Sequence, residues 1–323
     1  MNDRQTPPTA AAQGPDAVLP AGTRLGAFEL QRVLARSASS AVYLAVDHGL
    51  ALTVAVQEYL PARLVRRDAH GALLAIDAWH EDVVARGLRA FVDEARLLAH
   101  CDHPALVRVS QLFEAHNTAY RVMPYYTGRR LAEVRRDMSA APDEASLRAL
   151  LDDLLGALEA IHRSGRSHGG VTPDNILLLG DDRPLLLGPG AAGREIGSDL
   201  VESLMASVES PLSGGGAPAG SAPPRAIGDL YALAEVIRFC ITGALAPGGA
   251  TEPEAETLAE VIERRFEPAV RPRYSAELLG TLDAALSRSA EDWPISAGQF
   301  RTWLGRGAPI RPSRMRAGGA VHA

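Results

Sequence analysis

The chain has 323 residues, a mass of 34.2 kDa, a formal net charge of −6 and 46% hydrophobic residues. These values predict a packed, soluble chain and argue against a nucleic-acid-binding protein, which would carry a strongly basic surface. The two cysteines, Cys101 and Cys240, lie far apart in the sequence, which argues against a disulfide framework and favours free thiols in a reducing cytoplasm. Because no run reaches transmembrane length and no signal peptide is recognisable, we expect a cytoplasmic protein without a membrane span.

The sequence contains no lysine, so all of its basic residues other than histidine are arginine. Chemistry that depends on a lysine side chain is therefore excluded for this chain.

The first part of the chain is predicted to form strands with one helix. Residues 1–25 are rich in Pro, Ala, Gln and Gly and lack apolar periodicity, so we expect a disordered leader. The segments that follow are strand-like runs at 28–30, 42–45 and 52–56, an apolar helical face at 84–98, and strand candidates at 106–109 and 119–123.

The second part is predicted to be mostly helical. Its elements are apolar helical stripes at 147–161 and 230–241, a strand at 184–187 between them, and a C-terminal helix with a capping-box pattern at Ser296 and Gln299. The Gly, Pro and Ser content of 191–226 predicts a mobile loop, and 306–323 is predicted to be a flexible basic tail. Strands followed by helices predict an α+β fold, with a small β-rich lobe at about 26–124 and a larger helical lobe at about 128–305.

Several short motifs occur in a specific order. They are Val54–Pro61, Phe91–Arg96, His103–Pro104, Thr118–Tyr125, Ser167–Leu179 and Asp229–Leu233. Together, over residues 26–305, they resemble a eukaryotic-like serine/threonine protein kinase of the bacterial type. This resemblance implies a two-lobed protein-kinase-like fold.

The phosphate-binding positions implied by the resemblance are altered. Ala35, Ser37 and Ser40 stand at the three positions of the glycine-rich loop, where glycine lets the backbone approach phosphate closely. Gln57 stands at the position of the lysine that holds the α- and β-phosphates, whereas Glu94, the usual partner of that lysine, is retained. Without that lysine, Glu94 is expected to be solvated, hydrogen-bonded to Gln57, or paired with an arginine that the sequence does not identify.

The catalytic and metal-binding positions are altered as well. His168 and Asn175 of the catalytic loop are retained, but Gly169 and Gly170 stand at the Arg and Asp positions. A glycine cannot accept the proton of an attacking hydroxyl group. Gly188 stands at the position of the metal-binding Asp, and magnesium prefers carboxylate oxygens, so we expect no metal site.

The resemblance also implies an ion pair that restrains the activation segment, and its positions are altered. The Ala-Pro-Glu motif that ends this segment is not recognisable, and its arginine partner corresponds to Trp293. Both members of one structural pair are therefore absent.

The resemblance also implies a pocket for an adenine ring. The positions that would line it are apolar or aromatic, and they are Val42, Ala55, Met123, Tyr126 and Leu177. Core packing alone also favours such residues, so the pattern leaves both interpretations open.

We therefore expect a pseudokinase, with none of the catalytic residues intact, that acts as a binding or scaffold module in a bacterial signalling pathway. We expect no cofactor, and any ATP binding should not depend on magnesium. The expected partner is a protein, such as a kinase, a phosphatase or a substrate. Two alternatives stay open: a weak or atypical serine/threonine kinase that binds ATP, and a small-molecule sensor that uses the former adenine pocket.

Overall fold

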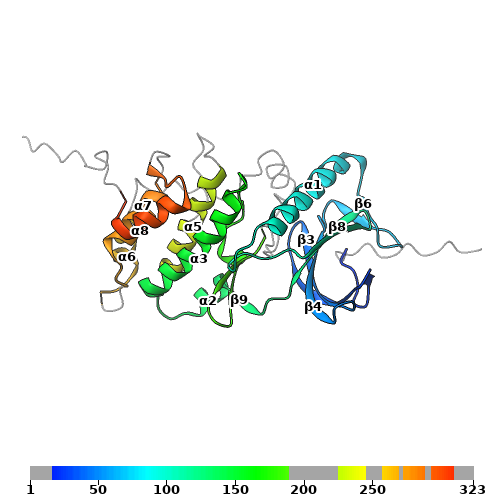
Figure 1. Cartoon of the computed structure of the whole chain (residues 1–323), viewed down its shortest axis with the longest axis horizontal. Helices are drawn as coiled ribbons and strands as arrows, with labels where there is room; N and C mark the ends of the chain where they lie inside the picture. Colours follow the sequence, from blue (N-terminus) through cyan, green and yellow to red (C-terminus); the bar gives the residue numbers. More distant parts are fainter. Residues whose placement is uncertain (1–16, 189–224, 245–256, 269–271, 288–291, 309–323) are drawn as a thin grey trace, which may run out of the picture.

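The computed structural model describes residues 17–188, 225–244, 257–268, 272–287 and 292–308. Within these residues the chain forms a sheet-rich half and a helical half, as the order of the predicted elements indicated (Figure 1). The predicted loop at 191–226 falls almost wholly outside the described residues, and so do residues 1–16 of the predicted leader and 309–323 of the predicted tail.

The first half is built on an antiparallel sheet of six strands in the order β1-β2-β3-β4-β8-β7. The strands are β1 (Arg24–Leu25), β2 (Phe28–Arg36), β3 (Ser40–Asp47), β4 (Leu52–Tyr59), β7 (Gln111–Ala115) and β8 (Thr118–Pro124). Between β4 and the first helix, β5 (Val65–Arg67) and β6 (Leu73–Ala75) form a separate hairpin.

Helix α1 (Ala78–His100) lies along this sheet beside β8 (Figure 1). Asp77 caps its N-terminus: the Asp77 carboxylate accepts a hydrogen bond from the His80 backbone amide and so satisfies one of the free donors at the helix start. Its buried face includes Phe91, Ala95 and Leu98, which recur at helical spacing as the sequence predicted.

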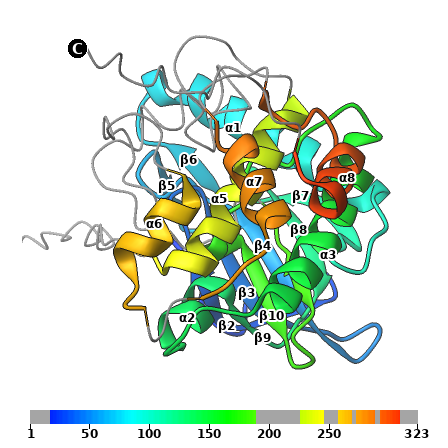
Figure 2. The same ribbon diagram turned by 90° about the vertical axis from the view of Figure 1, so that its left-hand side faces the viewer.

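The second half packs its helices around α3 (Glu144–His162), whose Leu147, Leu151, Leu154 and Leu158 are fully buried. Figure 2 shows α3, α5 and α7 lying together in front of the sheet. The remaining elements are β9 (Gly128–Arg130), α2 (Leu131–Asp137), the short 3-10 helix η1 (Pro173–Asn175), β10 (Ile176–Leu179), β11 (Pro184–Leu186), α5 (Arg225–Thr242), α6 (Leu258–Arg265), α7 (Ala276–Ala285) and α8 (Ala297–Arg306). The Ser296 hydroxyl caps α8 by accepting from the Gln299 backbone amide. The Gln299 side chain accepts from the backbone amide of Ile295 rather than from that of Ser296.

The predicted leader is too long. Leu19 and Leu25 are buried, the Leu19 amide donates to the Tyr43 hydroxyl at 3.1 Å, and Arg67 Nε donates to the Ala17 carbonyl at 2.7 Å. Residues 17–25 therefore belong to the sheet-rich half, because their few apolar side chains complete its core although they show no periodicity.

The strand predicted at 106–109 does not form. These residues make one isolated bridge, in which the Val107 amide donates to the Leu186 carbonyl at 2.9 Å. Ala105, Leu106, Val107 and Val109 are all buried, so the apolar run reflects burial between the two halves rather than strand pairing.

Candidate functional site

The site begins with a pair of residues on neighbouring strands. Gln57 on β4 lies opposite Arg121 on β8, and both are fully buried. Arg121 Nε donates to Gln57 Oε1 at 2.8 Å, and Gln57 Nε2 donates to Ser40 Oγ at 2.9 Å. The amide of Gln57 is thus hydrogen-bonded at both ends, as a buried polar group requires.

Arg121 supplies the cation for Glu94. Arg121 Nη1 donates to Glu94 Oε1 on α1 at 2.6 Å. The guanidinium carbon of Arg121 lies 4.9 Å from the centre of the ring of Phe91, which is also on α1. The arginine side chain is 0% exposed and that of Glu94 is 24% exposed. A charge-assisted hydrogen bond at this depth is stronger than a neutral one, so it holds α1 against the sheet.

Sequence reasoning missed Arg121 as this partner. The motif places the cation at 57 on β4, and the structure places it one strand away, on β8. An arginine inside the apolar strand 119–123 was the available signal, because a charged side chain in a buried strand needs a counter-charge.

Gly188 borders the same pair. A Cβ atom at this position would lie 2.5 Å from Arg121 Nη2 and 2.6 Å from Glu94 Oε1. Both atoms end flexible side chains, but Arg121 is held by Gln57, Glu94 and Phe91, so making room would disturb those contacts. Arg121 Nη2 has no hydrogen-bond acceptor among the residues that the structure describes.

The turn between β2 and β3 is closed by a serine. Ser37 Oγ accepts from the backbone amides of Ser39 and Ser40 at 3.3 and 3.0 Å, and it contacts Ser40 Oγ at 2.9 Å. In a phosphate-binding loop, amides at this place point at the ligand. Here the Ser37 side chain engages two of them.

The loop around His168 is held by internal hydrogen bonds. His168 Nε2 donates to the Leu187 carbonyl at 2.9 Å, and its Nδ1 accepts from the Gly170 amide at 3.2 Å. Burial lowers the pKa of His168, and this pattern of one donor and one acceptor fits the neutral ring. Asp229 on α5 accepts from the backbone amides of His168 and Gly169, both at 2.8 Å.

Asn175 lies at the end of η1 and is buried. Its side-chain Nδ2 donates to the Gly170 backbone carbonyl at 2.8 Å, and its backbone carbonyl accepts from the Leu187 backbone amide at 2.8 Å. These bonds close the loop on itself. In the described part of the chain, no group of three His, Cys, Asp or Glu side chains is arranged to hold a metal ion.

Four residues of the predicted adenine pocket share one apolar core cluster. Ala55 and Met123 are opposite on β4 and β8, both are buried, and Val42 and Tyr126 pack against the same core cluster. Burial raises the pKa of the Tyr126 hydroxyl. Leu177 is half-buried on β10 beside Gly128, where a Cβ would lie 2.9 Å from Leu177 Cγ. The pocket itself stays a prediction.

The phosphate and metal part of a magnesium nucleotide does not fit these residues. Gly170 and Gly188 offer no carboxylate, Arg121 is engaged by Glu94, and Ser37 engages the loop amides.

Trp293 is buried at the position of the missing arginine. Its ring meets that of Tyr231 on α5 edge-on, with 6.2 Å between centres, and its Nε1 donates to the Ser287 carbonyl at 2.5 Å. The aromatic side chain that corresponds to the family's arginine therefore packs against α5.

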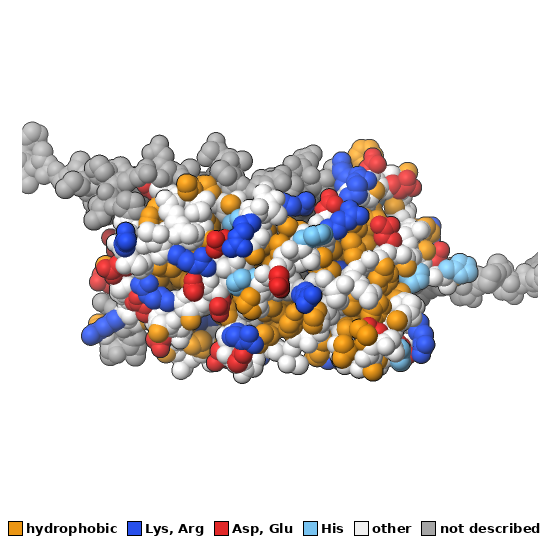
Figure 3. All heavy atoms as spheres, viewed as in Figure 1, with side chains coloured by type: hydrophobic (Ala, Val, Ile, Leu, Met, Phe, Trp, Pro, Cys, Tyr) orange, Lys and Arg blue, Asp and Glu red, His pale blue; other side chains and the backbone are white. Residues whose placement is uncertain are grey.

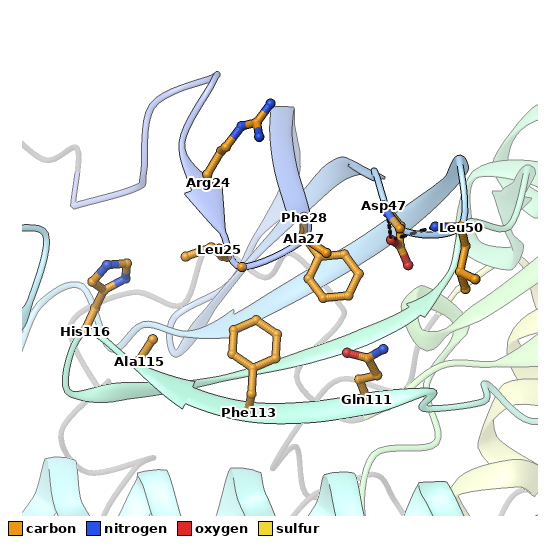
Figure 4. A pocket seen from close by; sticks show the side chains of 12 residues that line it. Arg24, Leu25, Ala27, Phe28, Asp47, Leu50, Gln111, Phe113, Ala115 and His116 are labelled. Atoms are coloured by element: carbon orange, nitrogen blue, oxygen red, sulfur yellow. Dashed lines mark hydrogen bonds between the residues drawn. The ribbon is translucent and has the colours of Figure 1, made fainter.

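A hollow of about 700 Å³ lies elsewhere, at the edge of the sheet between the β1–β2 turn and β7 (Figure 4). The rings of Phe28 and Phe113 stack across it with centres 6.0 Å apart. None of the predicted site residues lines this hollow.

Comparisons with known proteins agree with the fold. The family model "Protein kinase domain" matches residues 62–188. The solved structure described as "PpkA-294 apo form" is 31% identical, covers 90% of this chain and 100% of its own, and has a TM-score of 0.71. The fold is therefore that of a protein kinase.

Two curated relatives are bacterial serine/threonine-protein kinases. PkaB of Streptomyces coelicolor is 32% identical over 184 residues, which are 54% of this chain and 43% of PkaB. The kinase pkn2 of Myxococcus xanthus is 34% identical over 110 residues, which are 33% of this chain and 13% of pkn2. The chain thus spans less than half the length of these relatives.

The chain belongs to the eukaryotic-like bacterial serine/threonine protein kinase family, which confirms the resemblance seen in the motifs. Among the described residues, no helix is long and apolar enough to cross a membrane.

Proposed function

We propose that this chain is a pseudokinase, which keeps the kinase fold for binding and does not transfer phosphate. The observation that carries the proposal is the Arg121–Glu94 ion pair packed against Gly188. It occupies the space next to the backbone where the metal-binding Asp of a kinase would begin.

The loss of chemistry follows from three positions together. Phosphoryl transfer depends on positioning and on stabilising charge at the phosphates, with a base that orients the attacking hydroxyl. Gln57 is neutral, Gly170 has no side chain, and Gly188 offers no carboxylate to a metal. A lysine from elsewhere in the chain cannot take the place of the one missing at position 57, because the chain contains no lysine.

The protein would then act through its surface as a binding or scaffold module in a bacterial signalling pathway, in the cytoplasm. Both cysteines are free, Cys240 buried and Cys101 partly buried, which suits a reducing compartment. On the face shown in Figure 3, acidic and basic side chains are interspersed over the helical half, and apolar ones gather over the sheet half. The partner that we propose is a protein, such as a kinase, a phosphatase or a substrate.

The test is transfer of labelled phosphate from ATP to the protein itself and to a generic substrate. We expect none from the purified wild-type chain, and the Asn175→Ala variant serves as the control for a contaminating kinase. Transfer by the wild type that disappears in Asn175→Ala would overturn the proposal and favour an atypical kinase.

Partner binding is tested by pull-down from the native cell with two variants. Ala55→Trp is designed to fill the predicted adenine pocket and, provided that the variant folds, should leave the captured partner unchanged. Reversing the charges of the half-buried Arg86 and the exposed Arg89 on α1 should remove the partner, with thermal unfolding as the check that this variant also folds. Loss of the partner with Ala55→Trp alone would favour the small-molecule sensor.

A further inference from the structure

A tyrosine hydroxyl is pressed against a helix glycine. Tyr59, the last residue of β4, is buried, and its hydroxyl has no hydrogen-bond partner among the described residues. A Cβ atom at Gly87 of α1 would lie 2.1 Å from this hydroxyl and 2.8 Å from Cζ. Only glycine accepts the ring here.

Each of these residues is unfavourable by itself. A glycine inside a helix lowers its stability relative to alanine, and a buried hydroxyl without a partner costs free energy. Together they bring the ring of Tyr59 against the axis of α1, where it also meets the Phe91 ring with centres 6.0 Å apart. The contact therefore sets how closely α1 and β4 approach.

A second attachment lies two turns further along the same helix. Glu94 follows Gly87 by seven residues, and there the helix is bonded to Arg121 of β8 at 2.6 Å. Phe91 lies between the two attachments and contacts both Tyr59 and Arg121. The helix is thus joined to two adjacent strands by protein groups alone.

The end of β4 is itself fixed from the opposite face. Glu58 is fully buried and accepts from Tyr43 and Tyr120, each at 2.7 Å, and from Arg67 at 2.9 Å. Because successive side chains of a strand point to opposite faces, this network holds Tyr59 toward α1. The Glu58–Tyr59 pair of the β4 motif therefore has a role that needs no nucleotide.

We propose that these two attachments form a lock that keeps α1 in one position against the sheet, whether or not nucleotide or metal is present. The inference rests on the proposed function and deepens it, because a partner would then meet a permanently formed α1 surface. Movement of α1 would leave the buried guanidinium of Arg121 without its counter-charge and would expose the Tyr59 ring.

The test is hydrogen exchange of the full chain, followed in peptides from 78–100. In the wild type we expect the same protection with buffer, with adenosine and with ATP plus magnesium. Gly87→Ala should exchange about tenfold faster in this helix, because the helix opens locally when the contact is strained. Gly280→Ala is the matched control, since a Cβ on this glycine of α7 meets nothing within 4 Å.

Two further variants keep the test decisive if Gly87→Ala folds poorly. Tyr59→Phe in the Gly87→Ala background removes the closest clashing atom and should recover part of the protection. Glu94→Gln keeps the shape of the side chain but removes its charge, and should raise exchange at the C-terminal half of α1. Protection that rises on adding ATP and magnesium, or Gly87→Ala exchanging no faster than Gly280→Ala, would overturn the lock. Neither result requires phosphate transfer, so failure of the lock is distinguishable from failure of the proposed function.

Discussion

Arg121 lies directly opposite Gln57 on the adjacent strand and donates a hydrogen bond to it at 2.8 Å. The same guanidinium pairs with Glu94 at 2.6 Å. The positive charge that this acid needs has therefore not been lost; it stands one strand away and is fully buried. From there the guanidinium neutralises the Glu94 carboxylate on α1. A lysine at position 57 would in addition bind the phosphates of a nucleotide.

Arg121→Leu is expected to lower the free energy of unfolding by about 3 kcal/mol, because it leaves Glu94 without its partner and Gln57 with one bond fewer. Urea unfolding of the purified variant measures this change. Glu94→Leu added to Arg121→Leu should recover part of the loss, because apolar groups that replace both partners leave no lone charge. Purely additive effects of the two substitutions would show that the pair is not coupled.

Gly188→Ala is expected to destabilise the protein by about 1–3 kcal/mol, because the new methyl group meets Arg121 and Glu94 in a packed site. Thermal unfolding is the measurement. Gly180→Ala is the matched control, since a Cβ there has no neighbour within 4 Å. Equal stability of Gly188→Ala and Gly180→Ala would contradict the crowding described at Gly188.

Restoring the acid alone should not restore metal binding. Gly188→Asp is expected to show no magnesium-dependent thermal shift with ATP, because Arg121 and Glu94 border the added side chain. A clear magnesium-dependent shift in this single variant would mean that the pair moves aside easily.

The stability of the fold should fall on the acid side of neutrality because of His168. Burial lowers its pKa in the folded chain, outweighing Asp229 and Glu94, which raise it; Arg121 adds to the lowering. The unfolded chain then binds a proton near its ordinary pKa of about 6.5, while the folded chain does not, so stability is present above that pH and is lost as the pH falls below it. Urea unfolding at several pH values should give a slope that flattens in His168→Gln; an unchanged slope would assign the effect to another group.

The fold was largely predictable from local pattern. The apolar face of α1, the stripe of α3 and the motifs on β4, β8 and α5 each lie in the predicted element, because they depend on periodicity within one segment. The strand expected at 106–109 did not form, because a short buried run has the same pattern whether or not it pairs.

The sequence does not predict how the site residues pair with one another. The resemblance implies that a lysine, a base and a metal-binding acid are missing at Gln57, Gly170 and Gly188, and this stays a prediction. The arginine that pairs with Glu94 depends on the register between β4 and β8, which joins residues 64 positions apart. No local spacing contains that information, and the same holds for the fit of Tyr59 against Gly87.

We propose that the Arg121–Glu94 ion pair closes the phosphate and metal part of the site. The most direct test of this proposal is a calorimetric titration of the purified wild-type chain with adenosine, with ATP, and with ATP plus magnesium. We expect ATP to bind no more tightly than adenosine and magnesium to add nothing to the affinity, whether or not the adenine pocket takes up either ligand. An affinity for ATP that rises clearly when magnesium is added would contradict it.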